Sequence, residues 1–249
     1  MRWFACIAAL LFCLCSELTA DGKAASREVS IKAADGVLLR ATYFPAEKRG
    51  PAVLFFHQCS RQRALWTPLS SQMIQLGYHV LVVSPRGTED SGGEQWDYDG
   101  SLDHALTYWR EKWGTDAADA FQWLVSQPKV DRSKVVAAGA GCGAFMAILA
   151  AEQHPEIKRL VQLSGFEDRD TRAYVARTPA LAIFNVASAQ DSMSAAATET
   201  LKRVSKNPAS EFTVYPEKGH GISLVERYPG IQTALINWLK AKPSGTKSD

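Results

Sequence analysis

Short apolar segments recur along the sequence and restrict the fold more than any other feature. The clearest are AVLFF at residues 52–56 and HVLVVS at residues 79–84. A strand with one solvated face alternates apolar and polar residues, whereas a strand covered on both faces is apolar almost throughout. These segments therefore predict a mostly parallel sheet with helices on both sides.

Helical patterns alternate with these strands after an initial hairpin. The hairpin is expected over residues 28–33 and 37–44, joined by an Asp35-Gly36 turn. Further strands are expected at residues 52–56, 78–84, 134–138, 157–164, 180–185 and 211–215, and helices at 66–76, 116–126, 143–152, 195–206 and 231–240. This order predicts an α/β fold: a mostly parallel sheet of about eight strands that begins with an antiparallel hairpin.

The first twenty residues have the pattern of an export signal. Arg2 precedes an apolar run over residues 3–15, and the polar stretch that follows ends at Ala20. Because about 20 apolar residues are needed to cross a bilayer, this run favours a cleaved signal peptide over residues 1–20. An uncleaved membrane anchor is the alternative. We expect a periplasmic or secreted protein with no stable membrane insertion after cleavage.

Residues 21–249 are expected to form a single domain, since no repeat or change of composition divides them. The formal net charge of +2 comes without a basic block, which argues against a nucleic-acid partner. The sequence has no zinc-ligand spacing and no phosphate-binding loop, so neither a metal nor a cofactor is expected. A small molecule or another protein is the expected partner.

A longer stretch, residues 87–115, has no clear pattern and is expected to be irregular. Its aromatic residues include Trp96, Tyr98, Tyr108, Trp109 and Trp113. They could line a cleft, but we expect them mainly to cover the edge of the sheet. The later segment over residues 165–178 is short, so no lid domain is expected.

The segment GAGCG, residues 139–143, lies between a predicted strand and a predicted helix. A G-x-S-x-G segment in that position forms a sharp turn with a serine nucleophile at its apex, and its small neighbours let the backbones approach closely. Here Gly141 stands at the serine position and Cys142 follows it. The segment therefore has the backbone requirements of such a turn without its hydroxyl group.

The ordered set of motifs resembles the α/β-hydrolase superfamily, specifically small lidless members similar to dienelactone hydrolases and exported esterases. The matching segments are VLFFHQCSRQRALW, GYHVLVVSPRGTEDSGG, KVVAAGAGCGA, PALAIFNVASAQD and EFTVYPEKGHG. The resemblance implies an α/β-hydrolase fold in which His220 is the base and Asp191 is its carboxylate partner. Asp168 is a rival acid, and Gly141 takes the nucleophile position.

Loss of the nucleophile decides the functional expectation. Glycine has no atom that can attack a carbonyl, and removing a triad nucleophile costs about 10⁶ in turnover in a serine protease. We therefore expect a degenerate hydrolase whose His220–Asp191 cleft binds an ester-like small molecule or a protein. The alternative is an active ester or lactone hydrolase that uses Cys142 or a water activated by His220.

A more remote alternative is a dinucleotide-binding protein. Gly139, Gly141 and Ala144 satisfy a loose G-x-G-x-x-A fingerprint between a strand and a helix, with Glu167 or Asp168 as the ribose-binding acid. Several strands precede this motif, whereas the fingerprint normally opens its domain.

Two of the five cysteines, Cys59 and Cys142, lie outside the expected signal peptide. The resemblance implies an oxyanion hole formed by the backbone N–H of Cys142 and by that of Gln58 or Cys59. An export compartment permits disulfides. We hypothesise a Cys59–Cys142 disulfide that closes the former oxyanion hole; the alternative is two separate buried thiols.

Overall fold

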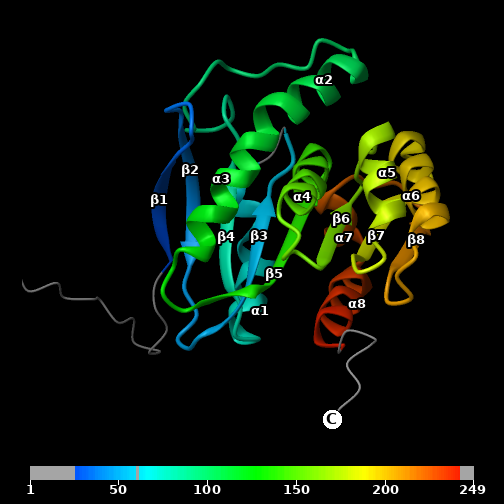
Figure 1. Ribbon diagram of the computed structural model, residues 1–249. Helices are drawn as coiled ribbons and strands as arrows, with labels where there is room; N and C mark the ends of the chain where they lie inside the picture. Colours follow the sequence, from blue (N-terminus) through cyan, green and yellow to red (C-terminus); the bar gives the residue numbers. More distant parts are fainter. Residues whose placement is uncertain (1–25, 60–61, 242–249) are drawn as a thin grey trace, which may run out of the picture.

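The computed structural model describes residues 26–59 and 62–241, so the expected signal peptide lies outside the described residues. Within these ranges the strands form one sheet in the order β1-β2-β4-β3-β5-β6-β7-β8 (Figure 1). Their bounds are β1 (Arg27–Lys32), β2 (Leu38–Phe44), β3 (Gly50–Phe56), β4 (His79–Ser84), β5 (Val130–Ala140), β6 (Arg159–Leu163), β7 (Ala182–Ser188) and β8 (Glu211–Tyr215). β2 pairs antiparallel with β1 and β4, and the other pairings are parallel. The predicted fold class is confirmed.

Alternate side chains of the strands enter two separate cores. In β3, Leu54 and Phe56 pack on one face, and Val53 and Phe55 pack on the other. The first face carries α2 (Leu102–Tyr108), α3 (Gly114–Val125), α4 (Cys142–Gln153), α5 (Arg169–Arg177) and α6 (Ser192–Val204), and the second carries α1 (Thr67–Gln75), α7 (Ile222–Arg227) and α8 (Pro229–Lys240) (Figure 1). None of these described helices is long and apolar enough to cross a bilayer.

The expectation of an irregular stretch over residues 87–115 is wrong for its second half. α2 continues through a π-helical turn, Trp109–Trp113, directly into α3. Ala105, Trp109, Trp113 and Ala117 recur every four residues and are all buried against the sheet-facing core. This spacing is helical, but the charged and polar residues between its members obscured it. Two further helices, α5 and α7, also lie in segments without a predicted element.

A buried ion pair holds the loop that follows β4. The Arg86 guanidinium contacts Asp116 of α3 at 2.6 Å and Asp35 of the β1–β2 turn at 2.5 Å. Burial lowers the pKa of Arg86, but the hydrogen bonds to both carboxylates outweigh it and raise the pKa overall. Arg86 therefore stays charged and ties this loop to α3 and to the first hairpin.

Candidate functional site

The chain turns sharply at Gly141, between β5 and α4. Its backbone has φ 55° and ψ −123°, a conformation that residues other than glycine rarely adopt. A β-carbon built on Gly141 would lie 2.9 Å from Nε2 of His220 and 3.1 Å from Cγ of Gln58. A side chain at the apex of this turn would therefore point at the imidazole of His220.

His220 lies on the loop between β8 and α7 and faces Asp191, which follows β7. Its Nδ1 is 2.5 Å from Oδ2 of Asp191, and Asp191 also caps α6 by accepting from the backbone N–H of Ser194. Burial raises the pKa of Asp191, whereas the hydrogen bonds from His220 and Ser194 lower it, and the net shift is downward. An ionised Asp191 orients the ring so that Nε2 points toward the apex of the turn.

The rival acid, Asp168, lies elsewhere. It caps α5 by accepting from the backbone N–H of Thr171, and its carboxylate contacts Arg110 at 2.8 Å. The other candidate for a ribose-binding acid, Glu167, pairs with Arg172 at 2.9 Å, so both acids are engaged and the geometry gives the dinucleotide alternative no support. Among the residues that the structure describes, no group of three His, Cys, Asp or Glu side chains is placed to hold a metal ion.

The region that corresponds to the oxyanion hole is cross-linked. Cys59, on the loop after β3, forms a disulfide with Cys142, the first residue of α4, with a Cα–Cα distance of 5.8 Å. The side chain of Gln58 lies between Gly141 and Gly221. A β-carbon on Gly221 would be 2.2 Å from its Oε1, and one on Gly141 would be 3.1 Å from its Cγ. The bridge leaves Cys142 without a thiol, so it cannot serve as a nucleophile while oxidised.

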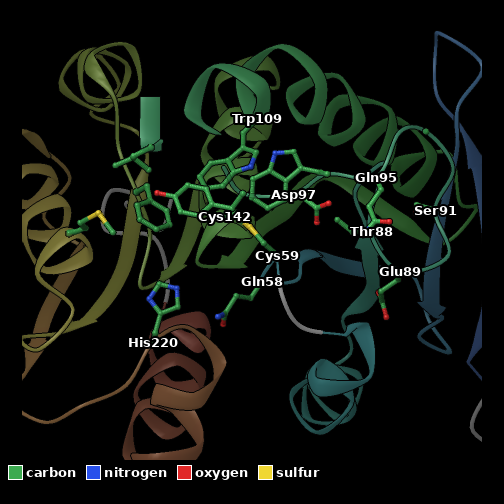
Figure 2. A pocket seen from close by; sticks show the side chains of 17 residues that line it. Gln58, Cys59, Thr88, Glu89, Ser91, Gln95, Asp97, Trp109, Cys142 and His220 are labelled. Carbon is green, nitrogen blue, oxygen red and sulfur yellow. A yellow bond between two sulfur atoms is a disulfide. The ribbon is translucent and has the colours of Figure 1, made fainter. Parts of the chain in front are cut away.

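A cleft of about 730 Å³ opens beside these residues (Figure 2). Figure 2 shows His220 at one side and Glu89 at the other, with the disulfide between them. The aromatic residues of its wall are Trp96, Tyr98, Trp109 and Phe166. The expectation that the aromatics mainly cover the sheet edge is thus incomplete: Trp113 is fully buried, whereas three of the others line the cleft.

Sequence reasoning missed a second polar cluster at the cleft. The fully buried imidazole of His57 has its Nε2 3.3 Å from Oε2 of Glu89, and Glu89 also pairs with Arg63. Burial lowers the pKa of His57, which favours the neutral ring. Glu89 has a φ of 47°, unusual for a residue other than glycine. Glu89 lies in a tight turn in which the backbone N–H of Ser91 donates to the carbonyl of Thr88 at 3.0 Å.

Comparison with solved structures places the fold. An acetyl xylan esterase from a Paenibacillus species matches with a TM-score of 0.71 and 16% identity, over 86% of this chain and 83% of that one. The DcsB protein, solved with its substrate analogue, matches with a TM-score of 0.68 and 15% identity, over 89% and 100% of the two chains. An esterase of Pyrococcus furiosus matches with a TM-score of 0.65 and 19% identity, over 87% and 90%. At these identities the likeness establishes an α/β-hydrolase fold.

Sequence comparison gives relatives and a family. Two uncharacterized proteins from two strains of Mycobacterium tuberculosis are each 29% identical over 133 residues, which is 53% of this chain and 43% of theirs. The match therefore spans less than half the length of these relatives. A model of the X-Pro dipeptidyl-peptidase (S15) family matches residues 35–229, from the β1–β2 turn to the start of α8. The chain therefore belongs to the X-Pro dipeptidyl-peptidase (S15) family, whose fold is that of the α/β-hydrolases.

Proposed function

We propose that this protein is an exported, degenerate member of its family that binds a small ligand beside His220 and Asp191 and forms no covalent intermediate. The observation that carries the proposal is the glycine at the apex of the turn. The imidazole and its carboxylate partner are in position, but the atom that they would activate is missing. The site can still orient the imidazole and bind a ligand without this atom, but it cannot form an acyl-enzyme through a serine.

The other hydroxyl groups of the cleft do not compensate for the missing serine. The hydroxyl of Thr88 donates to the backbone carbonyl of Pro85, and that of Ser91 donates to the carbonyl of Ser84, each at 2.8 Å. Neither hydroxyl bonds to the imidazole of His220, whose Nδ1 pairs with Asp191, and Ser223 bonds only to the backbone N–H and carbonyl of His220. This arrangement supports a site without a serine-type nucleophile.

Two further observations bear on the proposal. The Cys59–Cys142 disulfide supports export, because such bonds persist in oxidising compartments. Membership of the family does not imply peptidase activity for this chain, because Gly141 supplies no nucleophile for peptide cleavage. We therefore propose binding rather than hydrolysis as the function of the cleft.

The experiment compares the wild-type protein with His220→Ala in the hydrolysis of p-nitrophenyl acetate, with and without a reductant. We expect both proteins to hydrolyse this activated ester at the same background rate. Turnover that depends on His220 in the oxidised protein would identify a hydrolase with an activated water and overturn the proposal. Turnover that appears only after reduction would assign the chemistry to the Cys142 thiol and would also overturn it.

Export is tested on the protein recovered from its native source. An N-terminus at Asp21, together with the mass of one disulfide, is expected from the proposed cleavage after Ala20. A retained N-terminal segment in a membrane fraction would favour the anchor alternative.

A further inference from the structure

The wall of the cleft is acidic in a protein whose formal charge is slightly positive. Residues 87–109 contain six Asp and Glu and no Lys or Arg, against a net charge of +2 for the whole chain. Among the residues that the structure describes, those that line the cleft include Glu89 and Asp97 but no Lys or Arg. Glu89 is balanced by Arg63, whereas Asp97 is exposed and has no ion-pair partner among the described residues. Asp97 is therefore the carboxylate available to a ligand.

A continuous aromatic wall joins the acidic end of the cleft to His220. The ring centroids of Tyr98 and Trp96 are 6.4 Å apart, and those of Trp96 and Trp109 are 5.7 Å apart. Phe166 continues the wall, 5.7 Å from Trp109 and 6.2 Å from His220. Aromatic faces attract cations through the negative potential above the ring. The aromatic rings and the carboxylate of Asp97 thus both favour a cationic ligand.

An unpartnered donor in the same cleft indicates a second feature of the ligand. Trp109 is 3% exposed, and its indole nitrogen has no hydrogen-bond partner within the described chain. Figure 2 shows its side chain among those that surround the cleft. A buried donor without an acceptor is costly, and this nitrogen is itself shielded from solvent, so a ligand oxygen can accept from it once the indole ring turns toward the cleft.

We infer that the cleft binds an organic cation that also carries an oxygen acceptor, with the cationic group beside Asp97, Trp96 and Tyr98. The inference rests on the proposed function, because it assumes a cleft that binds without covalent chemistry. The uncharged part of the ligand extends along the aromatic wall toward His220. A neutral sugar could also stack on these rings, but it would leave the carboxylate of Asp97 without a charged partner.

The test measures binding of choline and of its uncharged carbon isostere, 3,3-dimethylbutan-1-ol, by calorimetry. Neither probe contains an ester, so the result does not depend on whether the protein hydrolyses anything. We expect choline to bind about tenfold more tightly than the isostere, which is the size of a cation–π and carboxylate contribution at a partly desolvated site. Asp97→Asn should remove most of this difference and leave binding of the isostere unchanged.

Asp103→Asn is the matched control. It removes the same charge from the same acidic segment, but Asp103 does not line the cleft. This variant should bind choline as the wild type does, and the melting temperatures should show that both variants fold. Equal binding of the two probes, binding of neither, or an equal loss in both variants would overturn the inference. Tighter binding of a neutral disaccharide such as cellobiose would overturn it too and assign the wall to carbohydrate.

Discussion

Gly141 and Gly143 exclude side chains for different physical reasons. A β-carbon on Gly141 would meet the movable ends of His220 and Gln58, at 2.9 and 3.1 Å. A β-carbon on Gly143 would meet backbone, 2.2 Å from the carbonyl oxygen of Phe56 and 2.5 Å from that of His57. Side chains can rotate away, whereas the backbone at the end of β3 cannot move without disturbing the centre of the sheet. Gly143 is therefore a packing requirement, whereas the proposed loss of the nucleophile concerns Gly141.

We expect Gly143→Ala to lower the free energy of unfolding by about 3 kcal/mol or to prevent folding, because the added methyl group overlaps buried backbone. Gly230→Ala is the control, since a β-carbon there has nothing within 4 Å and the residue lies in α8. This control should change stability by less than about 1 kcal/mol and in the stabilising direction. Urea unfolding measures both, and a wild-type midpoint for Gly143→Ala would show that the turn is looser than described.

The positions of His220 and Asp191 were predictable because each follows a strand of a parallel sheet. Such strands end at one edge, so the topology alone brings both residues together. The position of the Gln58 side chain was not predictable, because it depends on contact with Gly221 across the site. The contacts of the Glu89 carboxylate likewise depend on residues distant in the sequence, His57 and Arg63.

Among the elements, the disulfide joins the loop after β3 to the beginning of α4. The two cysteines are 83 residues apart in the sequence and together enclose α1, β4, α2, α3 and β5. The hypothesis of a Cys59–Cys142 bond, which rested on the resemblance, agrees with this connection. A cross-link over so long a segment restricts the unfolded chain more than a local one does.

Reduction of this disulfide should lower the free energy of unfolding by about 4 to 5 kcal/mol, from the chain-entropy cost of closing a loop of this length. Urea unfolding with and without a reductant measures the effect. The double variant Cys59→Ala, Cys142→Ala serves as the control and should not respond to the reductant. Two free thiols in the protein recovered from its native source, or equal stability in both conditions, would contradict the bond or its contribution.

The short buried strands were predictable because a short segment that is apolar almost throughout is typical of a strand covered on both faces. The helical run from α2 to α3 was missed at its start, although Ala105, Trp109 and Trp113 already have helical spacing. Asp103, His104, Arg110 and Lys112 alternate with them and hide the period in the sequence. Only packing against the sheet reveals which of these residues belong to the core.

In the whole molecule, the sheet and its helices position the residues beside the cleft. The two cores fix the sheet from both faces, and the loops at the carboxyl ends of β5, β7 and β8 bring Gly141, Asp191 and His220 to one place. The imidazole and its carboxylate partner are present in this arrangement, whereas Gly141 supplies no attacking atom. The protein should therefore acquire covalent reactivity when that atom alone is restored.

The most direct test is the intact mass of Gly141→Ser after treatment with a fluorophosphonate probe, beside the wild type and Gly141→Ala. We expect an adduct at position 141 of the serine variant, lost when His220→Ala is added, and no adduct on the other two proteins. A slow reaction is expected, because the β-carbon lies only 2.9 Å from Nε2 and the imidazole must withdraw slightly. An adduct on the wild type, or a folded serine variant that does not react, would contradict the account of Gly141 as a vacated nucleophile position.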